Sequence, residues 1–300
     1  MTDTHAAPAL LLERQGAIAT LAFNRPAALN AVDVPMAQAL LAAAQHLAAD
    51  PTVRAVVLRG EGKGFMAGGD LATLAADPVQ GAIDLIGPLN EAVALLHSLN
   101  APVIAQVHGV AAGAGLSLML QADFVMAAEG TRFNLAYINL GASCDVGASW
   151  ALPRLVGLRK ALEIAMLGDT LSATEALHLG LVNRVVPAPE LGAAVHQLAQ
   201  RLARQHGTGG GETQVHQAHQ HNRNGRPIHA ELHPAGDHLR QAKLGPLRRM
   251  QRHDATADQL TDEQADQRPE HITAQHHGQR PGDNRSDLQV GTHPQGELTE

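Results

Sequence analysis

Cysteine and aromatic residues are scarce in this sequence. Its 300 residues contain one cysteine, Cys144, so no disulfide can form within the chain and no zinc site built from several thiolates can exist. Aromatic residues make up 2% of the chain, and none lies after Trp150. A single free thiol is typical of a reducing compartment, and we therefore expect a cytoplasmic protein.

Excess positive charge and long apolar runs are also missing. The formal net charge is −7 with histidine neutral, which argues against a protein that binds nucleic acid by neutralising phosphates. No uninterrupted apolar segment reaches the length of a membrane span, and the first residues lack the basic start of a secretory signal. We expect no nucleic-acid partner and no membrane association.

The chain changes character near His206. From there to Glu300 it has no Phe, Trp or Tyr but carries 12 of the 18 histidines. Such a composition cannot bury enough apolar surface to offset the entropy of ordering, so the sequence predicts a core over residues 1–205 and a low-complexity, disordered tail over 206–300. The histidines have no repeating ligand spacing, which indicates adventitious metal affinity rather than a metal site. A sharper hypothesis is that the tail is translated out of frame, which resequencing around codon 206 would test.

Before this change, apolar periodicity predicts an α/β fold with much parallel strand pairing, because strands and helices alternate. Strands are expected at residues 10–14, 18–23, 53–59, 103–107, 124–128 and 181–186, and helices at about 33–46, 80–98, 159–167, 173–179 and 189–204. Asp33 is the expected N-cap of the first helix, with Pro35 in its first turn.

The most informative stretch runs from Val103 to Trp150. A short buried strand is followed by a turn that contains Gly109, Gly113 and Gly115, and then by the start of a helix. The first N–H groups of a helix have no internal partners, and small residues let a ligand oxygen approach them closely. We interpret this turn as one half of an oxyanion hole. A second glycine-rich loop, residues 60–71, also follows an apolar strand.

Six segments in order over residues 10–205 resemble the crotonase superfamily of enoyl-CoA hydratases and isomerases. They are FNRPAALNA (23–31), GEGKGFMAGGDL (60–71), APVIAQVHGVAAGAG (101–115), QADFVMAAEGTRF (121–133), LPRLVG (152–157) and GDTLSATEALHLGLVNRVV (168–186). The fold that this resemblance implies is a spiral of repeated ββα units, assembled as trimers or hexamers. The family's C-terminal helices, which cover its active site, have no counterpart after residue 205.

The resemblance implies binding of an acyl-CoA thioester whose carbonyl is polarised by two backbone N–H groups. By motif position these belong to Ala67 and Ala114, and they would hold the enolate oxyanion formed when a proton is removed beside the thioester. Coenzyme A would be part of the substrate, with no separate cofactor and no metal. Either loop alone would be interpreted as a tight turn.

The resemblance also implies which residues contact coenzyme A. The stretch Ala67, Gly68, Gly69, Asp70 and Leu71 would line the adenine site. Arg25 and Lys63 are candidate phosphate contacts, although exposed basic residues are more often simply solvated.

Two departures from the family pattern bear on the reaction. The positions where hydratases of the family carry their two glutamates hold Ser117 and Tyr137 here, and neither ionises readily near neutral pH. Ordinary hydration is therefore disfavoured. Tyr137 is expected to donate a hydrogen bond to substrate, or else to pack in the core with its hydroxyl satisfied. Ser117 is expected to be structural.

Asp145 is the remaining acidic candidate. The isomerases of aromatic acyl-CoA catabolism resemble this segment and carry an aspartate there, which would move a proton between two carbons. The alternative is that Asp145 caps the helix that begins near Gly147. Aryl-CoA dehalogenases share the aspartate but also use a histidine, and the corresponding position in this chain holds Asn90. His97 lies two helical turns after Asn90, so dehalogenation is disfavoured.

Three hypotheses follow from these residues. The first is an enoyl-CoA double-bond isomerase that uses the Ala67 and Ala114 N–H groups with Asp145 as acid and base. The second is an enoyl-CoA hydratase, a lyase of fatty acid metabolism. The third, which the altered C-terminus supports, is an inactive protein that binds coenzyme A.

Overall fold

The computed structural model describes residues 7–72 and 77–206. The predicted disorder of the tail concerns residues that lie outside these ranges, apart from His206. The strands are β1 (Leu10–Gln15), β2 (Ile18–Phe23), β3 (Ala55–Gly60), β4 (Val103–Val107), β5 (Val110–Ala112), β6 (Phe124–Ala128), β7 (Arg132–Asn134), β8 (Leu171–Ser172) and β9 (Arg184–Val186). The α-helices are α1 (Val34–Ala49), α3 (Pro78–Ser98), α4 (Ala114–Met119), α5 (Ala148–Val156), α6 (Leu158–Leu167), α7 (Ala173–His178) and α8 (Leu191–His206). Three 3₁₀ turns join them, η1 (Pro26–Ala28), η2 (Tyr137–Leu140) and η3 (Ala188–Glu190).

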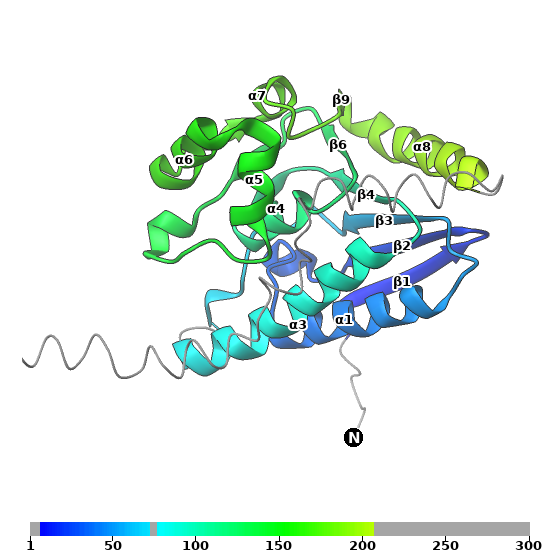
Figure 1. The fold of residues 1–300 in the computed structure, drawn as a ribbon, viewed down its shortest axis with the longest axis horizontal. Helices are drawn as coiled ribbons and strands as arrows, with labels where there is room; N and C mark the ends of the chain where they lie inside the picture. Colours follow the sequence, from blue (N-terminus) through cyan, green and yellow to red (C-terminus); the bar gives the residue numbers. More distant parts are fainter. Residues whose placement is uncertain (1–6, 73–76, 207–300) are drawn as a thin grey trace, which may run out of the picture. The chain divides into compact units, whose positions relative to one another are not determined.

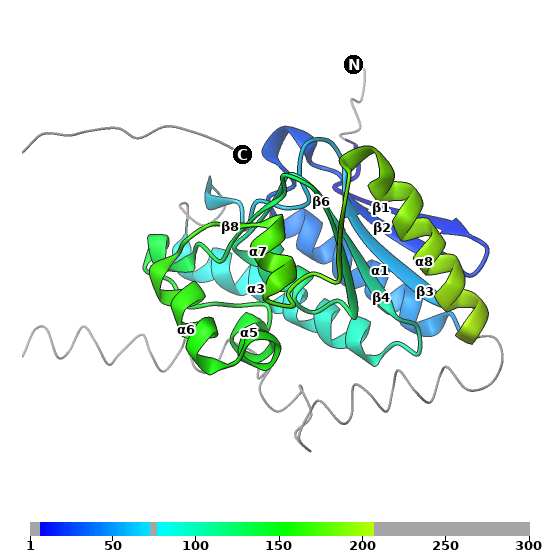
Figure 2. The same cartoon turned by 90° about the horizontal axis from the view of Figure 1, so that it is seen from above.

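A six-stranded sheet in the order β1-β2-β3-β4-β6-β9 forms the centre of the fold (Figure 1). Only the β1–β2 pair is antiparallel, and every other neighbouring pair is parallel. Alternate side chains of a strand point to opposite faces of the sheet. Both faces of this sheet are apolar, because successive residues of β3 belong to different buried clusters, Val56 and Leu58 to one and Ala55 and Val57 to the other. One face is covered by α1 and α3, and the other by α8 (Figures 1 and 2).

A second sheet of three short strands, in the order β5-β7-β8, shows how successive units repeat. β4 pairs with β6 in the large sheet, while the strand that follows each of them, β5 or β7, pairs in the small sheet. Each unit therefore gives its first strand to one sheet and its second strand to the other. This is the repeated ββα arrangement that the sequence predicts.

The long predicted strands and helices are confirmed, whereas the short strands β5, β7 and β8 were not predicted. Asp33 caps α1 as expected, because its carboxylate accepts a hydrogen bond of 2.9 Å from the Met36 N–H. The predicted strand over 181–186 is wrong in extent, since only Arg184–Val186 pairs with β6. Just before it, the Asn183 side chain accepts the Val125 N–H at 2.7 Å and so replaces a strand partner. β5, β7 and β8 have two or three residues each, too few to show a period.

Helix α3 deserves comparison with a membrane span, since Val79–Ser98 is long and apolar enough for one by length and composition alone. Asp84 and Glu91 lie within it. Its apolar side, which includes Leu85, Leu89 and Leu96, is buried in the same core as α1. One side of the helix therefore packs in the core, while 28% of the Val79–Ser98 window is buried.

Gly109 provides a test of how closely the backbone is packed at the end of β4. Its φ is +64°, and a Cβ there would lie 2.0 Å from the Lys63 carbonyl oxygen. Gly109→Ala should therefore lower the free energy of unfolding by about 3–5 kcal/mol, through left-handed strain together with a backbone clash. Gly16, at φ +59° in the β1–β2 turn, has no atom within 4 Å of such a Cβ and is the matched control. Gly16→Ala should cost only about 1–2 kcal/mol in urea unfolding, and equal losses would contradict the steric argument.

Candidate active site

The two glycine-rich loops lie side by side and are joined by main-chain hydrogen bonds. The Met66 N–H donates to the Val110 carbonyl at 3.1 Å, and the Ala112 N–H donates to the Met66 carbonyl at 2.9 Å. Gly115 permits this approach, because a Cβ there would lie 2.3 Å from the Met66 oxygen. The structure thus brings together the two loops from which the sequence predicts a single oxyanion hole.

The first predicted donor, Ala67, needs correction. Its N–H already donates to the Leu29 carbonyl at 3.0 Å, so it is not free to bind an oxyanion. The loop is held there by further bonds to the same segment, in which Val32 N–H donates to Gly68 O and Asp70 N–H donates to Val32 O, both at 2.8 Å.

These bonds make the N–H of Gly69, which motif position alone misses, the alternative candidate donor in this loop. In a parallel bridge such as that between Val32 and Gly69, the partner contributes the bonds through its two neighbours, Gly68 and Asp70. By this geometry the N–H of Gly69 itself points away from Val32. Only the pairing register shows this direction, and one sequence cannot supply it.

The position of Ala114 is compatible with its predicted role, which stays a prediction. It is the first residue of α4, so its N–H has no acceptor within the helix, and the residue is 6% exposed. The preceding N–H, of Gly113, is already bonded to the Asn134 carbonyl at 2.9 Å. The Gly69 and Ala114 N–H groups are therefore a candidate pair of donors, one from each loop.

Arg25 and Asp70, both predicted to contact coenzyme A, instead bind each other. The Arg25 guanidinium lies 2.9 Å from an Asp70 carboxylate oxygen and 3.1 Å from one of Asp33. It also donates to the Ala31 carbonyl. This partly buried ion pair fixes the first glycine loop against the start of α1. The contact of Arg25 with a phosphate of coenzyme A stays a prediction.

The other predicted contacts of coenzyme A are compatible with the structure and stay predictions. The side chains of Lys63 and Leu71 are exposed, and Leu71 is an unusually open apolar residue at 55%. Gly68 has φ +115° and faces the second loop, where a Cβ would lie 3.4 Å from the Ala112 carbonyl oxygen.

Asp145 and the two residues at the hydratase glutamate positions form one hydrogen-bonded group. The Tyr137 hydroxyl donates to Oδ1 of Asp145. The Ser117 hydroxyl lies 2.9 Å from the same Tyr137 oxygen and 3.1 Å from the Gly113 carbonyl oxygen. Because its one proton is given to Asp145, Tyr137 cannot at the same time donate to substrate, which corrects its predicted direct contact.

The alternative that Asp145 caps a helix is wrong. The N-cap of α5 is Gly147, and no side chain accepts a hydrogen bond there. Asp145 contributes only its main-chain carbonyl, which accepts the Ala148 N–H at 3.1 Å. Its carboxylate is left for Tyr137 and for whatever enters the site.

Burial dominates the electrostatics of this group. It raises the pKa of Asp145 above the ordinary value, an effect that the hydrogen bond from Tyr137 partly offsets. Burial and then the neighbouring Asp145 charge raise the pKa of Tyr137, so the phenol keeps its proton and acts as a donor. The pKa of the Cys144 thiol is raised by the same two causes, which makes it a poor nucleophile.

The resemblance places Asn90 at the position of the dehalogenase histidine, with His97 two turns further along α3. The Asn90 side-chain oxygen is buried with no hydrogen-bond partner among the described residues. The His97 ring is bonded to the Gln121 side chain at 3.0 Å. Within residues 7–72 and 77–206, no group of three or more His, Cys, Asp or Glu is placed to hold a metal ion.

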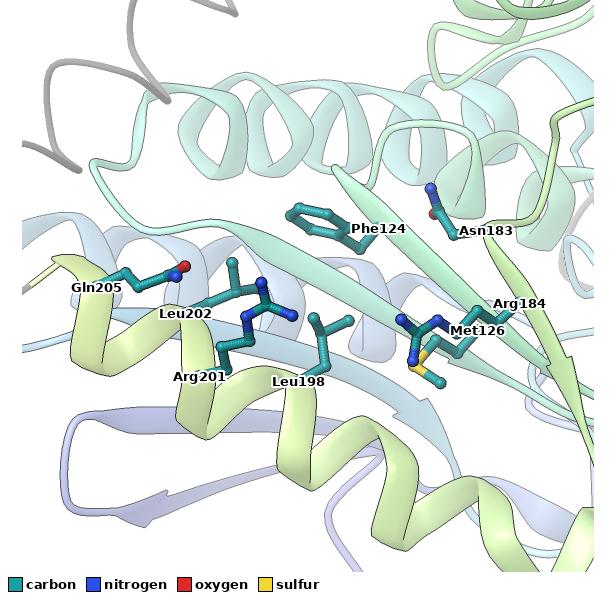
Figure 3. Close-up of a pocket in the computed structure, with 8 residues that line it drawn as sticks. All are labelled: Phe124, Met126, Asn183, Arg184, Leu198, Arg201, Leu202 and Gln205. Atoms are coloured by element: carbon teal, nitrogen blue, oxygen red, sulfur yellow. The ribbon is translucent and has the colours of Figure 1, made fainter.

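A cavity of about 360 Å³ lies between α8 and the β6–β9 edge (Figure 3). Phe124, Met126 and Leu198 line it, together with the guanidinium groups of Arg184 and Arg201. It faces the α8 side of the sheet, whereas Tyr137 belongs to the core on the α1 and α3 side. No carboxylate, histidine or cysteine is among its lining residues, so it lacks a group for acid–base chemistry.

Comparison with known proteins matches residues 13–233 to the family model for enoyl-CoA hydratase/isomerase. The chain is 40% identical over 192 residues to 1,2-epoxyphenylacetyl-CoA isomerase of Escherichia coli (strain K12), an alignment that covers 63% of this chain and 73% of that protein.

Solved structures agree with this match. An enoyl-CoA hydratase of Mycobacterium smegmatis superposes with a TM-score of 0.66 and 33% identity, covering 80% of this chain and 92% of that one. A monofunctional enoyl-CoA isomerase of the same species gives a TM-score of 0.59 and 31% identity, covering 71% and 91%. Hydratases and isomerases are thus both similar to this chain.

The raised pKa of Asp145 generates a stability prediction. A carboxyl whose pKa is higher in the folded state than in the unfolded state destabilises the fold once it ionises, and this penalty disappears as pH falls through the raised pKa towards the ordinary value of about 3.9. Asp145→Asn keeps an acceptor for Tyr137 but removes the charge. It should gain roughly 1 kcal/mol at pH 8, or about 2–4 °C in Tm, with a smaller gain at pH 5.

The control is Asp169→Asn, which removes an exposed carboxylate beyond α6. Thermal unfolding of this variant should resemble the wild type at both pH values. A Tm of Asp145→Asn that is lower than wild type at pH 8 would contradict the burial argument.

Proposed function

Because the chain belongs to the enoyl-CoA hydratase/isomerase family, we propose that it moves the double bond of an enoyl-CoA thioester and acts as an isomerase. The observation that carries this proposal is the half-buried carboxylate of Asp145. It accepts a hydrogen bond from Tyr137, which stands at a position where hydratases of the family have a glutamate. One group that accepts and then returns a proton is what an isomerisation needs.

The two loops supply the electrostatic part of the reaction. The thioester oxygen of a 3-enoyl-CoA would accept hydrogen bonds from the N–H groups of Gly69 and Ala114. Removal of a proton from C2 puts negative charge on that oxygen, and fixed donors in a dry site stabilise such charge by several kcal/mol. Backbone groups held by the Met66 pairing need no reorganisation to do so.

Asp145 supplies the proton transfer. Its carboxylate takes the C2 proton and becomes a carboxylic acid, while the electron pair moves into the dienolate. The acid then gives the same proton to C4, which forms the 2-enoyl thioester and regenerates the carboxylate. The raised pKa of Asp145 favours this role, since it makes the carboxylate a stronger base than an exposed aspartate.

Hydration is the second candidate, and the site favours it less. Adding water needs groups that orient and activate it, which hydratases of the family provide with two glutamates. Ser117 and Tyr137 stand at those positions and are bonded to each other at 2.9 Å. The described part of the chain brings no second carboxylate into hydrogen-bond contact with Asp145.

Assembly as a homotrimer or hexamer, and location in the cytoplasm, are also proposed. Support for assembly comes from a cluster of exposed apolar side chains on η2, α5 and α6, since large apolar patches mark interaction surfaces. The most exposed of them are Leu140, Leu158, Met166 and Leu167, at 58–65%.

The direct test is conversion of a 3-enoyl-CoA and of a 2-enoyl-CoA by the wild type, by Asp145→Asn and by the control Asp169→Asn. The wild type should isomerise the 3-enoyl substrate with negligible hydration of the 2-enoyl one. Asp145→Asn should lose a factor of about 10²–10⁴ in kcat, the usual share of a general base, and the control should keep its rate. Faster hydration than isomerisation, or full activity of Asp145→Asn, would overturn the proposal.

A wild type that converts neither substrate would leave the binding protein as the remaining hypothesis. A thermal-shift titration separates the two cases, because a ligand that binds only the native state raises its stability by about 2.7 kcal/mol at 100 times Kd. A rise in Tm with acyl-CoA but no turnover would identify a protein that binds coenzyme A.

A further inference from the structure

Ser117 and Tyr137 are both hydroxyl-bearing, both buried and in contact with each other. They come from different elements, α4 and η2, and their exposed fractions are 0% and 9%. Together with Asp145 they form a linear series of acceptors and donors that starts at Asp145 Oδ1 and stops at the main-chain carbonyl of Gly113. The isomerase mechanism described above uses the Tyr137 hydroxyl only as a hydrogen bond to Asp145, and it does not use Ser117.

Resting on that proposed function, we propose that Ser117 and Tyr137 are positioning residues that form a reversible hydrogen-bond chain. The chain satisfies Oδ1 of Asp145 whether this group is a carboxylate or a carboxylic acid. The chain also ends inside the protein, so that Asp145 keeps the proton taken from C2 until it is given to C4 of the substrate.

When Asp145 is ionised, the chain points towards it. The Tyr137 proton is given to Oδ1, and the Ser117 proton is given to the Tyr137 oxygen at 2.9 Å. The Gly113 carbonyl then loses the hydroxyl but keeps the Ser117 N–H, which donates to it at 2.9 Å. No buried donor is left unpaired in this state.

When Asp145 holds the substrate proton on Oδ1, the same groups can point the other way. The acid donates to the Tyr137 oxygen, Tyr137 donates to Ser117 Oγ, and Ser117 donates to the Gly113 carbonyl at 3.1 Å. If the proton is on Oδ2 instead, the first arrangement persists. Only hydroxyl rotation separates the two, so the sole proton that changes its covalent partner is the one exchanged between substrate carbon and Asp145.

The end of the chain determines the fate of that proton. A main-chain carbonyl neither titrates nor releases a proton, and Ser117 is fully buried, so the chain offers no path to solvent at its Ser117 end. The other titratable groups nearby are Cys144, whose pKa is raised, and His97 of α3, which is bonded to Gln121. We therefore expect the proton added at C4 to come mainly from C2 of the same substrate molecule.

The experiment compares Tyr137→Phe, Ser117→Ala and the double variant with the wild type, in the full chain. Thr131→Val is the matched control, because Thr131 carries another buried hydroxyl and is 1% exposed. This hydroxyl donates to the Ala128 carbonyl at 2.6 Å and has no hydrogen bond to Ser117, Tyr137 or Asp145. Three quantities are measured: the pH dependence of kcat/KM, the deuterium incorporated per turnover in D₂O, and the Asp145 carboxyl titration by ¹³C NMR of the free protein.

Loss of the Tyr137 hydroxyl removes a hydrogen bond to the charged carboxylate, so the pKa of Asp145 should rise and the acidic limb of kcat/KM should move to higher pH. A shift of about one pH unit, a tenfold change in the ionisation constant, is the size expected for such a bond. Ser117→Ala should move it the same way by less, and both variants should incorporate more deuterium than wild type. The double variant should resemble Tyr137→Phe alone, since Ser117 acts through Tyr137. Thr131→Val should match the wild type in all three.

Failure of this inference can be told apart from failure of the proposed function. Suppose that the wild type isomerises the substrate and Asp145→Asn does not. If both hydroxyl variants then keep the acidic limb of kcat/KM and the deuterium incorporation of the wild type, the hydrogen-bond chain is only structural. If no isomerisation occurs, the NMR titration still tests the hydrogen-bond chain. An unchanged Asp145 pKa in Tyr137→Phe would overturn the inference without any measurement of activity.

Discussion

The pairing of two loop backbones through Met66 is the constraint on which the rest of the site depends. Those bonds place one loop against the other at hydrogen-bond distance, and the distance is possible only because Gly109 and Gly115 have no side chain where it would collide with the first loop. Once the loops are joined, the N–H groups of Gly69 and Ala114 can serve one oxygen in the proposed reaction. Their geometry is fixed by the fold before any substrate arrives, which is the condition for electrostatic preorganisation.

A second constraint is the burial of Asp145 with a hydroxyl partner. An ionised carboxylate in such surroundings costs stability, and the protein offsets part of that cost with the Tyr137 hydrogen bond. The same burial that weakens the fold makes the group a stronger base. Stability and reactivity are therefore opposed at this one residue, as is common where an active site depends on a perturbed pKa.

The candidate site was predictable in part. The spacing of glycines after two apolar strands pointed to both loops, and Asp145 stood out because the acidic residues expected at positions 117 and 137 were absent. Motif position indicated Ala67, because a linear motif does not show which N–H is already bonded within the fold; a one-residue step in an extended chain reverses the direction of the N–H. Arg25 was expected to be exposed, since its partners Asp33 and Asp70 lie 8 and 45 residues away in the chain.

The sequence alone determined the fold class, the order of the long strands and helices, the N-cap at Asp33 and the absence of the hydratase carboxylates. These follow from local periodicity, capping chemistry and residue identity, all of which act over a few positions. The tertiary structure alone decided that Asp145 is bonded to Tyr137 rather than capping α5, and that Ser117 completes the group. Those contacts join residues 8 and 20 positions apart on separate elements, and their distances depend on how the two sheets and the intervening turns pack together.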